Sequence, residues 1–237
     1  MDQTGPITIV WAIAAVVTVC LGPSIIFKLT RLPLDRETIR GILAEGAIKK
    51  TATTGLILLF LWQAKESLGD LGLASENLGQ GLLIGLPAGV GILIVNALLS
   101  NVLLPRVLPS RWRGEGEPTF LKEHLKTPLR LLMLIGFSWW AAGFVEELER
   151  AFLITRIGSL FGTAVALIVT SVFFGARHWY QGKASAAIST SVSGFLFGTV
   201  WLMAGRNLIT AIVAHATLDS LALILLYLMW RRESVSA

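Results

Sequence analysis

Long apolar stretches limit how this chain can fold more than any other feature of its sequence. A helix needs about 20 apolar residues to cross the hydrocarbon core of a bilayer. Stretches of this kind, one of them short, recur along the chain at residues 7–27, 51–64, 82–104, 131–150, 160–178, 184–204 and 208–230. The pattern predicts an all-α fold, a polytopic bundle of transmembrane helices with about seven (six to eight) spans.

The composition supports the membrane class and leaves little sequence for anything else. Charged residues make up 15% and hydrophobic residues 54% of the 237 residues, whereas a soluble domain is about 25% charged. The mean hydropathy is +0.71. We therefore expect a single membrane domain with no second, soluble domain. The first stretch lacks the basic residues that precede a secretory signal, so we expect it to be a retained transmembrane helix.

The basic residues lie mainly between the apolar stretches, where they indicate topology. The net charge is +5, but because these residues read as topology signals, we expect no nucleic-acid partner. The basic parts that fall on one side of a seven-span bundle are residues 28–50 and 105–130, Lys183, and the pair Arg231 and Arg232. The net acidic residues 65–82 fall on the other side. Because basic loops face the cytoplasm, we expect an integral protein of the plasma (inner) membrane with its N-terminus outside and its C-terminus cytoplasmic.

Four ionisable residues interrupt the fourth apolar stretch: Glu146, Glu147, Glu149 and Arg150. An ionised side chain inside a membrane is costly unless it is paired or faces water. On a helix, Glu146 and Arg150 are four residues apart and share a face, whereas Glu147 lies about 100° round the axis. The alternative is that the span ends here and the charges lie among lipid headgroups. Apolar residues resume at once at 151–154, which favours a polar cluster inside the membrane.

Two histidines and an aspartate occur in the later apolar stretches. His178 ends the fifth stretch, and taken alone it is equally well explained as an interfacial anchor. His215 and Asp219 lie four residues apart on one face of the seventh stretch, with apolar sequence on both sides. For this pair the alternative is a packing hydrogen bond between helices.

Carboxylates, imidazoles and one guanidinium from three helices are sufficient for hydrolysis. A buried carboxylate can act as a general base, and a histidine beside it can share the activated water. The pair His215 and Asp219 can stabilise an oxyanion or position the water. Alternatively, Glu146, His178 and His215 can hold a divalent metal such as zinc. The residues leave both schemes open, and the single cysteine, Cys20, provides no thiolate metal site.

The order of these motifs resembles the CPBP family, the CAAX protease and bacteriocin-processing (Abi) proteins. Its members include the type II CAAX prenyl endopeptidases, which are intramembrane proteases. The family pattern is Glu-Glu-x-x-x-Arg, then Phe-x-x-x-His, then His-x-x-x-Asn or His-x-x-x-Asp, each motif on its own transmembrane helix. The resemblance covers residues 131–226. It implies that residues 1–130 supply N-terminal transmembrane helices and basic cytoplasmic loops, and that residues 131–230 form the catalytic helical core.

The first family motif maps onto residues 146–150. Glu146 matches the glutamate that activates water, and Glu147 matches the adjacent acid. The family arginine follows the second glutamate by four residues, whereas Arg150 follows Glu147 by three. Arg150 is therefore expected to share a face with Glu146 more closely than with Glu147, and either glutamate remains a candidate for the base.

The second and third motifs supply the remaining residues that the resemblance implies. His178 matches the partner of the glutamate in water activation, and Phe174 of the same motif is expected to contact the substrate. His215 and Asp219 match the pair that stabilises the oxyanion or positions the water. The resemblance favours a mechanism with no obligate cofactor, although a divalent metal such as zinc is compatible with it.

The expected function is that of an intramembrane endopeptidase that cleaves a membrane-associated peptide or protein within the lipid bilayer. The substrate is either unmodified or lipid-modified, since prenylated peptides are the substrates of the eukaryotic relatives. One alternative is a non-catalytic membrane protein of the same family, with an immunity or binding role, which the shifted arginine supports. A small transporter ranks third, because the sequence shows no paired Gly/Pro interruptions of the kind that broken transporter helices carry.

Overall fold

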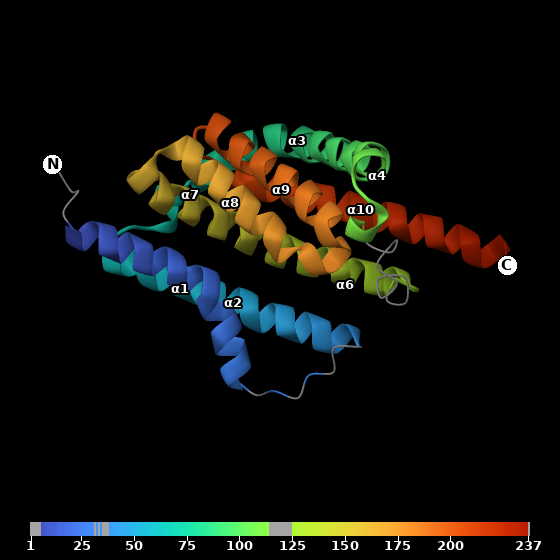
Figure 1. Cartoon of the computed structure of the whole chain (residues 1–237), viewed down its shortest axis with the longest axis horizontal. Helices are drawn as coiled ribbons and strands as arrows, with labels where there is room; N and C mark the ends of the chain where they lie inside the picture. The colour runs from blue at the N-terminus through green and yellow to red at the C-terminus, as the bar shows by residue number, and fades with distance from the viewer. Residues whose placement is uncertain (1–5, 31, 33, 35–37, 114–124, 237) are drawn as a thin grey trace.

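The protein is helical in the part of the chain that its computed structural model describes, namely residues 6–30, 32, 34, 38–113 and 125–236 (Figure 1). Its α-helices are α1 (Pro6–Thr30), α2 (Ile39–Ala64), α3 (Leu78–Leu98), α4 (Leu104–Val107), α6 (Pro128–Ser138), α7 (Glu147–Phe161), α8 (Thr163–Arg177), α9 (Trp179–Met203) and α10 (Leu208–Ser236). Two π-helical segments join α3 to α4 and α6 to α7, at Leu99–Leu103 and Trp139–Glu146. Short 3-10 turns lie between helices at Leu68–Leu71, Ser75–Asn77 and Ser110–Trp112.

The long helical rods of the described residues confirm the predicted bundle of about seven helices. They are α1, α2, α3 with α4, α6 with α7, α8, α9 and α10. Five stretches are long and apolar enough to cross a membrane: Ile9–Thr30, Leu68–Val107, Pro128–Phe161, Trp179–Met203 and Leu208–Arg232. The chain is therefore an all-α integral membrane protein, in which α8 contributes a shorter apolar helix of 15 residues.

Helix α2 is longer than the sequence predicted. The predicted span covered residues 51–64 and left 28–50 as a connection, but the helix begins at Ile39. Its first turn is stabilised by the side chain of Thr38, which accepts a hydrogen bond of 3.2 Å from the backbone N–H of Gly41. Glu45 and Lys49 form an ion pair one helical turn apart. Lys49, one of the charges that indicated a loop, is thus paired on a helix.

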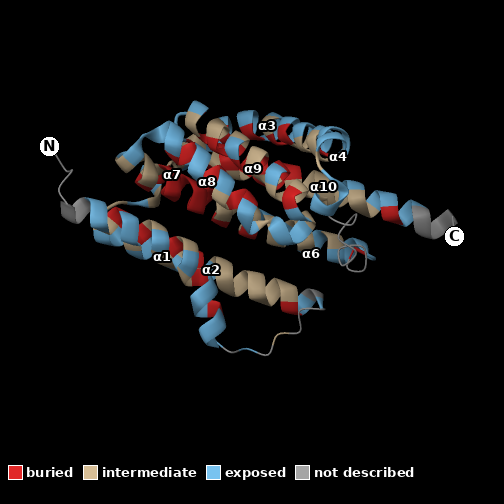
Figure 2. Ribbon diagram, in the orientation of Figure 1, coloured by how far each residue is buried: buried red, intermediate tan, exposed pale blue. Residues whose placement is uncertain are grey.

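The interior of the bundle lies where α7, α8, α9 and α10 meet (Figure 2). Phe152, Trp201 and Leu208 are among the most deeply buried side chains. Small residues allow close approach of the helices, as is usual in membranes. A Cβ atom on Gly89 of α3 would lie 2.4 Å from the backbone oxygen of Ala214, so glycine there brings α3 against the part of α10 that carries His215.

The chain ends and the helix connections divide between two ends of the bundle, with the N- and C-termini on opposite ends (Figure 1). At one end, a backbone bridge joins Arg113, which follows α4, to Lys183 near the start of α9. At the other end, the backbone N–H of Leu208 donates to the carbonyl oxygen of Gly72 at 3.1 Å. Two of the basic parts predicted to share a side, those of Arg113 and Lys183, therefore lie at the same end of the molecule. The cytoplasmic orientation of this end stays a prediction.

Candidate active site

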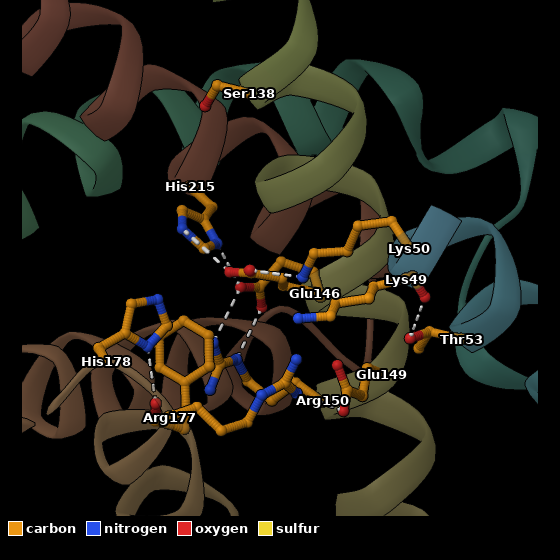
Figure 3. Close-up of polar contacts among 12 residues, drawn as sticks. Lys49, Lys50, Thr53, Ser138, Glu146, Glu149, Arg150, Arg177, His178 and His215 are labelled. Atoms are coloured by element: carbon orange, nitrogen blue, oxygen red, sulfur yellow. Dashed lines mark hydrogen bonds and ion pairs between the residues drawn. The ribbon is translucent and has the colours of Figure 1, made fainter. Parts of the chain in front are cut away.

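The two adjacent glutamates lie where the π-helical segment Trp139–Glu146 passes into α7. Segments of this kind are frequent at functional sites. Glu146 extends toward α2, whereas Glu147 is 1% exposed and extends toward α10. Neighbouring carboxylates on one rod therefore meet different partners, as the close-up in Figure 3 shows for Glu146.

Arg150 pairs with Glu147, although the spacing was expected to place it on a face with Glu146. Its Nε donates to Oε2 of Glu147 at 3.0 Å, and its Nη2 donates to Oε1 at 3.2 Å. Residues three apart on a helix are neighbours, as are residues four apart. The orientation of the carboxylates decides between them, because Glu147 and Arg150 both extend into the protein while Glu146 extends toward α2. The guanidinium also lies 4.1 Å from the ring centre of Phe174.

His215 of α10 is held by Glu147 and by an aromatic ring. The distance from Nδ1 of His215 to Oε1 of Glu147 is 2.7 Å, and the imidazole stacks on Phe197 of α9 with ring centres 4.3 Å apart. A carboxylate only accepts hydrogen bonds, so Nδ1 carries the proton of this contact. In the neutral ring Nε2 is then the proton acceptor, and it lies 4.0 Å from Oε2 of Glu146.

Asp219 lies one turn beyond His215 and is the more exposed of the two. Its Oδ1 atom is 3.9 Å from Nε2 of His215. Its Oδ2 atom accepts a hydrogen bond of 2.6 Å from the hydroxyl of Ser138 in α6. The sequence motifs did not indicate Ser138. Small residues such as serine are common where membrane helices pack closely, so its presence in an apolar stretch did not mark it as a site residue.

His178 lies at the junction of α8 and α9 and is half-buried. Its Nδ1 atom is 2.7 Å from the backbone oxygen of Phe174, and because a carbonyl oxygen only accepts, Nδ1 is the protonated nitrogen. The Phe174 ring is near both imidazoles, with its centre 4.6 Å from that of His178 and 6.1 Å from that of His215. All three motifs therefore meet around Phe174, and Figure 3 shows His178, His215 and Glu146 converging.

Lys50 of α2 is the charged partner that the sequence did not indicate. Its Nζ atom donates to Oε1 of Glu146 at 2.6 Å (Figure 3). Because residues 28–50 were assigned to a connection, Lys50 was counted as a topology signal. The spacing of Glu45 and Lys49, four residues apart, is the local signal that the helix continues through these charges.

Glu149 takes no part in this group. Its Oε1 atom accepts a hydrogen bond of 2.7 Å from Nη1 of Arg177, and this pair joins α7 to α8. Three glutamates that are almost adjacent in sequence are thus compensated by three different cations: Lys50, Arg150 and Arg177.

The residues suggested for a metal, Glu146, His178 and His215, do not form a ligand group. Within the described residues, no three His, Cys, Asp or Glu side chains lie close enough together to hold a metal ion. One carboxylate oxygen of Glu146 already binds the ammonium of Lys50, and Nδ1 of His215 is directed at Glu147. A second cation at Glu146 would lie against the lysine charge.

The comparison with known proteins covers the later part of the chain. Residues 128–221 match a family model described as type II CAAX prenyl endopeptidase Rce1-like. This segment runs from α6 into α10 and includes every residue of the three motifs. No curated protein and no solved structure matches the chain. The resemblance expected from the motifs is confirmed: residues 128–221 of this chain are similar to the Rce1-like type II CAAX prenyl endopeptidases.

Proposed function

We propose that the protein is an intramembrane endopeptidase that hydrolyses a membrane-associated peptide or protein with water activated by Glu146. The observation that carries this proposal is the position of Glu146. One of its oxygens binds Lys50, and the other is directed at Nε2 of His215 from 4.0 Å. A water molecule can hydrogen-bond to both atoms, because two hydrogen bonds of about 2.8 Å each reach across such a gap.

Glu146 is a better candidate for the base than Glu147. Both oxygens of Glu147 are hydrogen-bonded, to Arg150 and to His215. In the described part of the chain, Glu146 uses only Oε1 in a hydrogen bond. A base needs a free lone pair within reach of the water it deprotonates. Glu147 instead orients His215, much as a buried acid orients the histidine of a catalytic triad.

The proposed reaction conserves every proton. Glu146 accepts a proton from water as the water oxygen bonds to the scissile carbonyl carbon, and the peptide C–N bond then breaks as the proton passes to the leaving nitrogen. His215 and Asp219 position the water, or, when the His215 ring carries a second proton, its Nε2–H donates to the oxyanion. Because Nδ1 of His178 is bound to the backbone oxygen of Phe174, Nε2 is the atom through which His178 can hold the water.

The arrangement reduces the support for a non-catalytic relative. That alternative rested on the spacing of Arg150, which was expected to separate the arginine from the second glutamate. The guanidinium nevertheless binds Glu147 through two hydrogen bonds. The shorter spacing therefore leaves the arginine–glutamate pair intact.

The proposal places the basic end of the bundle in the cytoplasm and the protein in the plasma (inner) membrane. Arg113 follows α4, Lys183 lies near the start of α9, and Arg231 lies near the end of α10. Basic residues flanking membrane helices stay on the cytoplasmic side. Cysteine-labelling reagents that do not cross membranes are expected to leave a cysteine placed at Arg111 unmodified in intact cells and to modify one placed at Glu76.

Replacing His178 by alanine tests the activity itself. Wild type and variant are reconstituted in phosphatidylcholine vesicles with two pools of synthetic peptides, one of single-span peptides and one of farnesylated peptides. New N-termini, identified by mass spectrometry, are expected with the wild type. The variant is expected to be slower by about 100-fold or more, the usual contribution of an acid–base group. A wild type that cleaves neither pool contradicts the proposal.

Chelation tests the proposal that no metal is obligatory. Because the lysine ammonium contacts Glu146, we expect dialysis against EDTA or 1,10-phenanthroline to leave the cleavage rate unchanged. Loss of activity that returns on adding zinc would show that the metal scheme is correct.

A further inference from the structure

Lys50 reaches the candidate site from outside the part of the chain that matches the family model. It belongs to α2, which ends more than 60 residues before residue 128. Its side chain is 12% exposed and that of Glu146 is 14% exposed, with 2.6 Å between Nζ and Oε1. This largely buried ion pair therefore connects two parts of the bundle: α2, and the continuous rod formed by α6 and α7.

The adjacent lysine, Lys49, has a different partner and is more exposed. Lys49 binds Glu45 of its own helix at 2.6 Å, is 36% exposed and lies over the ring of Phe27. Successive residues of a helix lie about 100° apart, and the Nζ atom of Lys49 binds Glu45 whereas that of Lys50 binds Glu146. The chain thus supplies a lysine at the site and a matched lysine beside it that contacts no site residue.

A buried ion pair of this kind contributes little to the stability of the fold. Desolvation of two buried charges offsets most of their attraction, and apolar pairs of similar size are often as stable. The contact does, however, fix one carboxylate oxygen of Glu146 and leave the other directed at His215. It also supplies a compensating charge, without which an ionised carboxylate in this apolar setting is unfavourable.

We propose that Lys50 is a positioning residue that holds Glu146 ionised and oriented toward His215, so that α2 completes the active site. This role rests on the proposed endopeptidase function. A lysine suits the task because its compact ammonium binds one oxygen, whereas the planar guanidinium of an arginine binds carboxylates through both oxygens.

The kinetic test compares three variants in the vesicle assay with the peptide that the wild type cleaves best. Lys50→Met is expected to lower kcat by about 100-fold, the effect of a misplaced reacting group, with KM unchanged. Lys50→Arg keeps the charge, and its kcat is expected to lie between that of Lys50→Met and that of the wild type. Lys49→Met is the matched control and is expected to cleave at the wild-type rate. A kcat for Lys50→Met equal to that of Lys49→Met overturns the proposal.

A second test does not depend on activity. The thermal unfolding midpoints of Lys50→Met, Glu146→Leu and the double variant are compared in the same detergent, because leucine, unlike glutamine, removes the hydrogen bond to Lys50. If the two side chains interact, the unfolding midpoint of the double variant is expected to change by less than the sum of the changes in the two single variants. Shifts that add without coupling overturn the contact. A wild type that cleaves no peptide refutes the endopeptidase function and the role of Lys50 with it, whereas a cleaving wild type with an unaffected Lys50→Met refutes the role of Lys50 alone.

Discussion

Replacing Glu146 by glutamine is expected to abolish cleavage while the protein stays folded. Glutamine has the same shape, and its amide oxygen can still accept the hydrogen bond from Lys50 that the carboxylate accepts in the wild type. A neutral amide cannot take a proton from water, so the rate should fall by about 100-fold to 10,000-fold. Cleavage of the peptide pools in vesicles gives the rate, and the unfolding midpoint with size-exclusion chromatography reports the fold.

Glu149→Gln provides the matched control for this prediction. Glu149 is a buried carboxylate on the same helix and is also bound to a cation, Arg177. It has no contact with His215 or Glu146 in the structure, so the folded fraction of this variant should cleave at the wild-type rate. Equal activity of Glu146→Gln and Glu149→Gln would show that Glu146 is not the base.

Replacing Glu147 by leucine is expected to destabilise the protein as well as inactivate it. The substitution leaves the guanidinium of Arg150 without its partner in a position that is 4% exposed. Removing one member of a buried ion pair costs about 3–5 kcal/mol. It also removes the acceptor that holds Nδ1 of His215. We therefore expect a lower unfolding midpoint in detergent and no cleavage.

The double variant Glu147→Leu/Arg150→Met separates the two effects. With both charges replaced by apolar groups, the unpaired guanidinium is gone and most of the lost stability should return. Cleavage should not return, because His215 still lacks its orienting carboxylate. Recovery of cleavage in the double variant would mean that Glu147 acts only by compensating Arg150.

The helical bundle was predictable because lipid restricts the backbone to very few structures. Apolar stretches of membrane length give the rods directly, and α1, α9 and α10 lie close to the predicted residues 7–27, 184–204 and 208–230. The start of α2 was not predictable in the same way. Hydropathy counts Lys49 and Lys50 as loop residues, whereas their partners, Glu45 and Glu146, allow the helix to include them.

Which residues belong to the candidate site was easier to predict than which of their side chains pair with one another. Ionisable residues within apolar stretches identified Glu146, Glu147, His178 and His215, because such residues need a partner in the membrane. Which carboxylate takes Arg150 depends on side-chain direction at the end of a π-helical segment, and hydrophobic periodicity does not record this. The contribution of Lys50 depends on a contact between residues 96 apart in the chain, for which no local pattern exists.

If water activated at Glu146 cleaves a peptide bond inside the membrane, one oxygen of the new carboxyl group comes from the solvent. This origin of the oxygen is tested most directly by running the vesicle assay in water enriched in the heavy oxygen isotope and analysing the products by mass spectrometry. The wild type is expected to release products whose new carboxyl group carries one solvent oxygen, and Glu146→Gln is expected to release none. Products without the solvent oxygen, or equal labelled product from the variant, would contradict it.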